Sequence, residues 1–222
     1  MGKAEENKQH KLEALFNNAY ELFLTQGIEK TTINDIVKKA GVAKGTFYLY
    51  FTDKYHIRDQ LIAKTADKLF CDAYKAMENE NIPSLEDRII FIVDYVLDCM
   101  RKNKPMLRFI SKNLSWGIFR HAMTKNLPGE DINAYDIYKK LLLDHPDCRL
   151  RAPETMLFLI IELASSTAFS TILENDPISF DELKPDLNAS IRAIIKNHTL
   201  SREACGARPC EASAIRDARK GI

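Results

Sequence analysis

Apolar residues recur at steps of three and four along most of the chain, which is the spacing that places them on one face of an α-helix. The first such series, within residues 8–26, consists of Leu12, Leu15, Phe16, Ala19, Leu22 and Phe23. Glycines and prolines stand where these series break, as is typical of helix ends. The pattern predicts about nine helices, over residues 8–26, 33–40, 44–50, 54–80, 84–103, 105–125, 130–144, 153–175 and 185–198. We therefore expect an all-α fold.

Two of the predicted helices, 33–40 and 44–50, are short and follow one another across Gly41. Thr32 is a suitable N-cap for the first of them, and Asp35, three residues later, completes an approximate capping box. Two short helices joined by a tight turn behind a longer helix make a helix-turn-helix, the unit that places its second short helix in the major groove of DNA.

The second short helix divides its residues into two sets. Phe47 and Phe51, four positions apart, point into the core that the three helices share. On the outward side or near the helix ends lie Lys44, Gly45, Thr46, Tyr48 and Tyr50. This set offers a cation, a position without a side chain, a hydroxyl and two phenols, which suit a groove lined by phosphates, base edges and thymine methyl groups. We predict that this face binds double-stranded DNA.

Composition and charge change this picture only slightly. The 222 residues are 45% hydrophobic and 28% charged, which suits a soluble globular protein, and only 8 Gly and 8 Pro argue against an all-β fold rich in turns. The formal net charge is +1, so the chain as a whole does not indicate nucleic-acid binding. Residues 30–64 carry seven basic side chains against three acidic ones, an excess that favours DNA binding only modestly.

The same segment resembles a known family. Residues 31–51 read TTINDIVKKAGVAKGTFYLYF, and Thr52-Asp53-Lys54 continues the match. In order and spacing, over about 45 residues from Ala14 onward, this run is similar to the DNA-binding signature of the TetR family of transcriptional repressors.

The resemblance implies a division of the chain into two domains. Residues 1–54 would be a three-helix helix-turn-helix head, and residues 55–198 a helical ligand-binding and dimerisation domain. Asp53 can cap the helix 54–80 that links the two. The remaining residues 199–222 are rich in Ala, Arg, Ser and Gly, and we expect them to be a weakly ordered tail.

Carried over position by position, the resemblance implies a set of DNA contacts. The residues concerned are Thr32, Lys44, Gly45, Thr46, Tyr48, Tyr50 and Lys54. The start of the recognition helix would lie closest to the bases, whereas the capping threonine, the two tyrosines and the last lysine would contact phosphates. Ala43 departs from the family's pattern, which often has Ser or Thr there as a cap. Because alanine forgoes that hydrogen bond, at a cost of about 1 kcal/mol, we expect a frayed recognition helix in the free protein.

One head covers about one major groove, so we expect a homodimer that reads two half-sites. Helix 153–175 is apolar nearly all round, and small residues on it would let a partner helix approach closely. The resemblance implies an interface of four helices, two from each subunit. The predicted interface residues are Phe158, Ile161, Ala164, Ser165, Ala168, Leu187, Ile191 and Ile194. Ordinary packing within one subunit stays an alternative for many of them.

The middle helices are expected to enclose a cavity for a small-molecule effector. Their aromatic and sulfur-bearing side chains suit a lipophilic or flat aromatic ligand. The candidate residues are Tyr95, Cys99, Phe109, Trp116, Phe119 and Met123. The same spacing is also typical of a plain helical core, and that alternative stays open. By resemblance, ligand and DNA would be coupled through a shift of helix 54–80.

The sequence therefore predicts a ligand-responsive transcriptional repressor that binds a palindromic operator. The alternative is a helical protein-interaction module that keeps the fold without specific DNA binding. No G-x-S-x-G, Walker loop, H-E-x-x-H or C-x-x-C pattern occurs, so we expect no enzyme, no metal site and no cofactor. The most apolar run, residues 156–169, falls short of the roughly 20 apolar residues that a membrane helix needs. With no leader pattern and scattered cysteines, we expect a cytoplasmic protein without a membrane segment.

Overall fold

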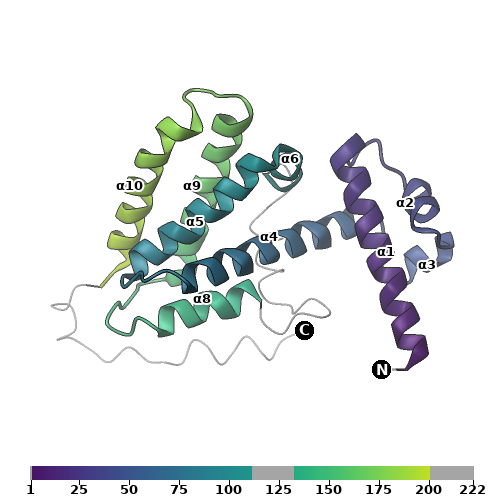
Figure 1. Ribbon diagram of the computed structural model, residues 1–222, viewed down its shortest axis with the longest axis horizontal. Helices are drawn as coiled ribbons and strands as arrows, with labels where there is room; N and C mark the ends of the chain where they lie inside the picture. The colour runs from purple at the N-terminus through teal and green to yellow at the C-terminus, as the bar shows by residue number, and fades with distance from the viewer. Residues whose placement is uncertain (1, 112–132, 201–222) are drawn as a thin grey trace.

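The computed structural model describes residues 2–111 and 133–200, and these ranges are helical apart from short connections and one isolated antiparallel bridge between Leu150 and Thr199. The helices, drawn in Figure 1, are α1 (Lys3–Gln26), α2 (Ile33–Ala40), α3 (Lys44–Tyr48), α4 (Lys54–Glu78), α5 (Leu85–Lys102), α6 (Lys104–Ser111), α8 (Ala134–Leu143), α9 (Pro153–Leu173) and α10 (Phe180–His198). The predicted all-α fold, with a helix-turn-helix head followed by a helical domain, is confirmed.

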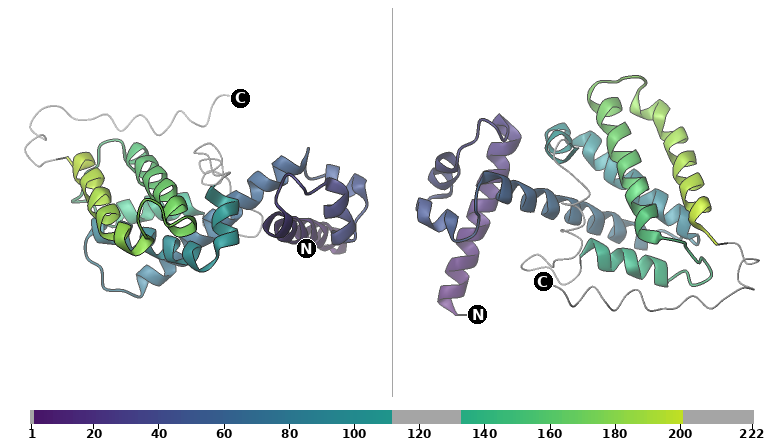
Figure 2. Two further views of the ribbon diagram at one scale, coloured as in Figure 1. Left: turned by 90° about the horizontal axis from the view of Figure 1, so that it is seen from above. Right: turned by 180° about the vertical axis from the view of Figure 1, so that it is seen from behind.

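Figure 1 shows two groups of helices joined by α4. Helices α1, α2 and α3 form a head at one end, and α5, α8, α9 and α10 gather at the other end of α4. The two views in Figure 2 likewise keep the head well apart from the α9–α10 pair. With 25 residues, α4 is about 37 Å long at 1.5 Å per residue. Because α4 belongs to both groups, it is the mechanical link between them.

The start of α2 is fixed by a reciprocal pair of hydrogen bonds. The Asp35 amide donates to Thr32 Oγ1 at 3.2 Å, and the Thr32 amide donates to Asp35 Oδ2 at 2.9 Å, which confirms the predicted capping box. The Thr32 hydroxyl also donates to Asp35 Oδ2 at 2.7 Å. The hydroxyl first, and then the amide, hold the pKa of the Asp35 carboxyl below its ordinary value.

The turn that follows α2 uses the one residue type that accepts its backbone conformation easily. Gly41 has φ 68°, in the left-handed region, and the Val42 amide donates across it to the Val37 carbonyl. After α3, Asp53 caps α4 by accepting hydrogen bonds from the amides of Tyr55 and His56, both at 2.8 Å. The predicted Asp53 cap is therefore confirmed.

Ion pairs join α10 to α5 at the far end of the molecule. The guanidinium of Arg192 lies 2.7 Å from carboxylate oxygens of both Glu86 and Asp87, and Arg101 lies 2.7 Å from Asp181. All five side chains keep part of their surface in solvent, so each pair contributes only about 0–1 kcal/mol to stability. The apolar surface buried between the two helices contributes more to the stability of this contact than the ion pairs do.

A buried carboxylate joins α8 to α4. Asp67 of α4 is 2% exposed and accepts a hydrogen bond from the Ala134 amide at 2.6 Å. Ala134 is the first residue of α8, so the negative charge meets the positive end of that helix's dipole. This contact fixes where α8 begins relative to the linking helix.

The start of α10 differs from the sequence prediction. The helix begins at Phe180 rather than at residue 185, and Pro185 lies inside it. The reason is a second capping box: the Glu182 amide donates to Ser179 Oγ at 3.3 Å, and the Ser179 amide donates to Glu182 Oε2 at 2.9 Å. The cap therefore sets the boundary, and the proline is accommodated in the second turn.

Other helix ends also differ from the predicted ones. α1 begins at Lys3 instead of residue 8, and α3 ends at Tyr48 instead of residue 50. The predicted helix 105–125 corresponds to α6 only in its first part, and its remainder lies outside the described residues. The same holds for residues 201–222 of the predicted tail.

α9 extends beyond the apolar run seen in the sequence. It has 21 residues and is apolar enough that, by length and composition alone, it is able to cross a membrane, so the expectation that this segment is too short is wrong. One such helix is weak evidence, because the core helix of a soluble protein passes the same test. Here α9 packs against α5, α6 and α10, and Met156, Ile160 and Ala168 are fully buried.

Candidate nucleic-acid interface and effector cavity

The outer face of α3 is the candidate DNA-binding surface. On the inner side, Phe47 and Phe51 are 0% and 2% exposed, and the Phe16 ring meets Phe51 edge-on at 5.3 Å between centroids. On the outer side Tyr48 is 52% exposed, and Lys44 and Gly45 are exposed with it. Among the other predicted contacts, Thr32 is exposed and Thr46, Tyr50 and Lys54 are half-buried. The buried rings of Phe47 and Phe51 therefore anchor a short helix. Its Lys44, Gly45 and Tyr48 face solvent.

Two of the predicted phosphate contacts are occupied inside the head instead. Lys54 Nζ donates to the carbonyl oxygens of Ile28, Glu29 and Thr31 at 3.0, 3.2 and 3.2 Å, which uses all three N–H groups of the ammonium. The Tyr50 hydroxyl donates to a carbonyl of α1 at 3.2 Å. In this structure Lys54 therefore pins the α1–α2 connection to the start of α4, and a phosphate contact would cost it one of these bonds.

The start of α3 has the weakness that the sequence indicates. Ala43 occupies the N-cap position and makes no side-chain capping bond. The helix is only five residues long, and further bonds from the amides of residues 50 and 51 to the Phe47 carbonyl fasten its end. Packing of Phe47, rather than capping, thus holds the recognition helix in place.

Leu49 is a surface residue that the sequence reasoning missed. Its side chain is 79% exposed, and at 100° per residue it lies nearly opposite the buried Phe47 and one turn after Gly45. The signal was present, because a leucine on the side of an amphipathic helix away from the core has no partner within the fold. Leu49 and Tyr48 together make the outer face of α3 partly apolar.

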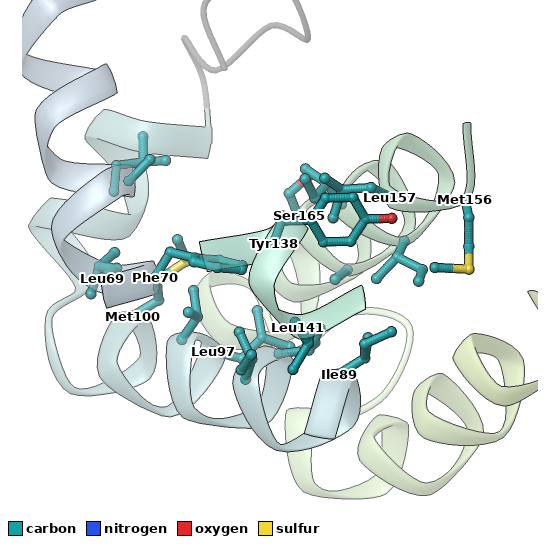
Figure 3. Close-up of a pocket in the computed structure, with 18 residues that line it drawn as sticks. Leu69, Phe70, Ile89, Leu97, Met100, Tyr138, Leu141, Met156, Leu157 and Ser165 are labelled. Carbon is teal, nitrogen blue, oxygen red and sulfur yellow. The ribbon is translucent and has the colours of Figure 1, made fainter. Parts of the chain in front are cut away.

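The second candidate site is a cavity of about 120 Å³ between α4, α5, α6, α8 and α9. Figure 3 shows its lining, in which Leu69 and Phe70 from α4, Leu97 and Met100 from α5, and Tyr138 from α8 surround the space. Among the described residues, the lining consists of Ala66, Leu69, Phe70, Ile89, Ile92, Val93, Val96, Leu97, Met100, Ile110, Tyr138, Leu141, Met156, Leu157, Ile160, Ile161, Ala164 and Ser165. Within residues 2–111 and 133–200, no three His, Cys, Asp or Glu side chains gather as they would around a metal ion.

Comparison with known proteins places the head. The family model described as bacterial regulatory proteins, tetR family, matches residues 15–61. An uncharacterized HTH-type transcriptional regulator, YvdT of Bacillus subtilis (strain 168), is 43% identical over 63 residues, 27% of this chain and 32% of that protein. An HTH-type transcriptional regulator of Staphylococcus aureus (strain USA300) is 26% identical over 179 residues, 80% of this chain and 88% of that protein.

The head of the chain is therefore similar to that of the TetR family over residues 15–61. Its matched segment spans about a third of the length of YvdT but most of the length of the staphylococcal regulator. The family that matches this segment is one of bacterial regulatory proteins, and its match includes α2 and α3.

Solved structures of TetR-family proteins share the whole fold. A putative family member from Shewanella sp. PV-4 matches with a TM-score of 0.59 at 16% identity, covering 86% of this chain and 99% of that one. The fatty acid degradation regulator FadR of Bacillus halodurans matches with a TM-score of 0.58 at 13% identity, over 82% and 97%. FadR of Bacillus subtilis, solved in complex with stearoyl-CoA, gives 0.57 at 14%, over 82% and 98%.

Three of the predicted effector residues, Tyr95, Cys99 and Phe109, are not among the described residues that line the cavity. Tyr95 and Cys99 are half-buried on α5, next in sequence to the lining residues Val96 and Met100. Phe109 is buried elsewhere. The other three predicted residues, Trp116, Phe119 and Met123, lie outside the described residues.

Phe109 instead packs α6 against the head. Its ring stacks on Phe23 of α1 at 6.0 Å between centroids with 18° between the planes, and it meets Tyr20 edge-on at 5.5 Å. Phe109 is 4% exposed. Because α6 also contributes Ile110 to the cavity, two neighbouring residues of one helix touch the head and the cavity.

Most of the predicted interface residues are buried, or partly buried, within the subunit itself. Four of them are 6% exposed or less: Ala164, Ala168, Leu187 and Ile191. Ile161 and Ser165 line the cavity, and Phe158 and Ile194 are half-buried. The alternative of packing within the subunit therefore describes several of these positions.

Proposed function

We propose that the protein is a ligand-responsive repressor that binds a palindromic operator as a homodimer and leaves it when a small lipophilic effector enters the cavity. The observation that carries the proposal is the outer face of α3, where Lys44, Gly45 and Tyr48 are exposed while Phe47 is fully buried beneath them. A recognition helix needs this division, since its base-reading side must be free of the core.

On the DNA side, Lys44 and Thr46 at the start of α3 would read base edges, and Tyr48 would contact a phosphate or a thymine methyl group. Thr32, at the start of α2, would reach a phosphate of the same groove. Tyr50 and Lys54 would help by positioning, because their polar groups are bonded within the head.

A dimer would use the outer faces of α9 and α10. Leu159 of α9 is 40% exposed, and Glu162 and Ser166 continue that face at steps of three and four. On α10 the exposed Ala189 and Ala193 lie one turn apart, and their small side chains would allow a second subunit to approach closely. This surface would set the spacing of the two heads.

On the effector side, the cavity and the head share α4 and the neighbouring α6. A ligand that changes how α4 packs at the cavity would move the head at its other end, and the coupling would be reciprocal. The fold similarity to a FadR protein solved with stearoyl-CoA supports a ligand response in this part of the molecule. Such a regulator would act in the cytoplasm, where its operator DNA lies.

Selection of bound duplexes from a random pool tests the proposal directly. We expect a palindrome of about one and a half to two turns of DNA. Tyr48→Ala and Lys44→Ala should each weaken binding to it by about tenfold without lowering the melting temperature, whereas Lys75→Ala, an exposed lysine near the far end of α4, should not change binding. A pool without enrichment would favour the alternative, a helical protein-interaction module.

A further inference from the structure

We infer that the cavity takes a compact, uncharged aromatic or hydrocarbon molecule with at most one hydrogen-bonding group, and that it excludes ionised acids and acyl-CoA thioesters. The inference rests on the proposed effector response and names the class of molecule that drives it. It is carried by the lining, the volume and the cost of burying an unpaired charge.

The lining contains no charged side chain among the described residues. Its polar atoms are the Tyr138 hydroxyl and the Ser165 hydroxyl, and the first is already used, because it donates to the Pro153 carbonyl at 2.8 Å. Burial raises the pKa of the Tyr138 phenol, so this group stays neutral. A cavity with so few partners holds water poorly, and an apolar ligand loses little by displacing what is there.

The volume limits the size of the ligand. An apolar cavity of about 150 Å³ in another protein stays dry and binds benzene. At about 120 Å³, this cavity matches a single aromatic ring or a branched hydrocarbon of similar size. A long acyl chain with a nucleotide head is several times larger than this volume.

Charge gives an independent reason to exclude acids. A carboxylate transferred into an apolar cavity without a partner loses its hydration, at a cost far above what one ring gains by burial.

Ser165 supplies the single place for a polar group. Its hydroxyl makes one long hydrogen bond, at 3.4 Å, to the Glu162 carbonyl of its own helix. Figure 3 draws Ser165 and Tyr138 among the side chains that line the cavity. A phenol or a small alcohol is able to exchange a hydrogen bond with Ser165 Oγ while its ring occupies the apolar space.

The test compares three probes with the full-length chain at pH 7: toluene, benzoate and stearoyl-CoA. Toluene and benzoate share a ring and differ in the ionised group. We expect toluene, at about ten times its dissociation constant, to raise the melting temperature by about 3–6 °C, and benzoate and stearoyl-CoA to leave it unchanged. A shift with benzoate or stearoyl-CoA as large as that with toluene, or no shift with toluene, would overturn the inference.

Two variants locate the binding. Ala66→Leu fills the cavity from α4 and should abolish the toluene shift, whereas Ala76→Leu, at a half-buried position of the same helix outside the lining, should keep it. If Ala66→Leu fails to fold, Leu97→Ala enlarges the cavity and should let naphthalene produce the shift that wild type does not give. Toluene shifts insensitive to both changes would place binding elsewhere and contradict the inference.

Release from operator DNA is measured separately with the same probes. Toluene that stabilises the protein but leaves DNA binding unchanged would sustain the ligand class and contradict the effector response proposed above. Release by stearoyl-CoA without release by toluene would support the effector response and contradict the ligand class.

Discussion

The head and the cavity are built on opposite principles, although α4 runs through both. The head presents a convex face, and hydrogen bonds between neighbouring residues, such as those of Thr32 with Asp35 and of Asp53 with the α4 amides, fix its shape. The cavity is concave, and apolar side chains from five helices far apart in sequence surround it. Hydrogen bonds at the helix ends, together with the packing of Phe47 and Phe51, thus fix the head, whereas the sensing site depends on how whole helices pack.

The difference assigns separate tasks to polar and apolar interactions. Directed hydrogen bonds hold the head in one arrangement, which a surface that must match a DNA groove requires. Packing without directed bonds lets neighbouring helices shift when a ligand enters, which a sensor requires. The four predictions below test this division, from the largest expected effect to the smallest.

Phe109→Ala should separate the two regions. Loss of the rings' contact between α6 and α1 should cost about 3–5 kcal/mol of unfolding free energy, as is usual for a buried phenylalanine. Because the contact joins the head to the rest, urea unfolding followed by circular dichroism should change from one transition to two. Phe91→Ala, which removes a half-buried ring of α5, should lower stability and keep a single transition. A single transition in Phe109→Ala would mean that α4 alone couples the regions.

Lys54→Met should damage the head and spare the cavity. Removing the ammonium takes one donor from each of three carbonyl groups, of which Ile28 keeps its bond from the Thr31 amide, and we expect a loss of about 2–3 kcal/mol together with weaker operator binding. Lys30→Met removes the same charge from an exposed position in the α1–α2 connection and should stay within about 0.5 kcal/mol. Unfolding in urea measures both. Equal stability of the two variants would show that the carbonyl contacts contribute nothing.

Leu49 should read a thymine methyl group. Replacing thymine by uracil at the contacted position removes that methyl, and wild-type affinity should fall about fourfold, the value of one buried carbon. Leu49→Ala should bind the thymine operator less tightly and no longer distinguish it from the uracil one. Leu143→Ala, at a leucine 78% exposed on α8, is the matched control and should behave as wild type. Undiminished wild-type binding to uracil operators would contradict the contact.

Ala43→Ser should strengthen the start of α3. A serine hydroxyl at this N-cap accepts a bond from the helix amides, with a gain of about 0.5–1 kcal/mol. Slower hydrogen exchange of the amides of residues 45 to 48 is the measurement. Ala189→Ser places the same hydroxyl inside α10, where it should lower stability slightly. Unchanged exchange in α3 would mean that the packing of Phe47 already fixes this end.

The parts of the fold that follow from neighbouring residues were predictable from the sequence. The Thr32 and Asp53 caps, the turn at Gly41 and the inward position of Phe47 each depend on residues within one turn of helix. Where two local signals competed, the prediction was wrong: Pro185 suggested a helix start, but the cap at Ser179 sets it.

Contacts that depend on the crossing of helices were beyond the sequence. Lys54 finds its carbonyl partners more than twenty residues upstream, where α1 and α4 cross, and no periodicity encodes that. In the cavity a single position decides the outcome, since Val96 lines the space and the adjacent Tyr95 does not. Periodicity identifies a buried face, but helix packing decides which part of it borders a void.

The engagement of Lys54 also changes how the protein should respond to salt. Of the seven basic residues between positions 30 and 64, Lys54 binds carbonyls, Lys39 pairs with Glu21 and Arg58 pairs with Asp59, while Lys64 lies over the Phe16 ring. Lys30, Lys38 and Lys44 remain exposed. Each neutralised phosphate contributes about −0.9 to the slope of log affinity against log salt concentration. A dimer that uses these three lysines in each head should therefore give a slope of about −5, whereas seven basic residues per head would give about −13. Operator recognition would then tolerate changes in cellular ionic strength that release more basic regulators.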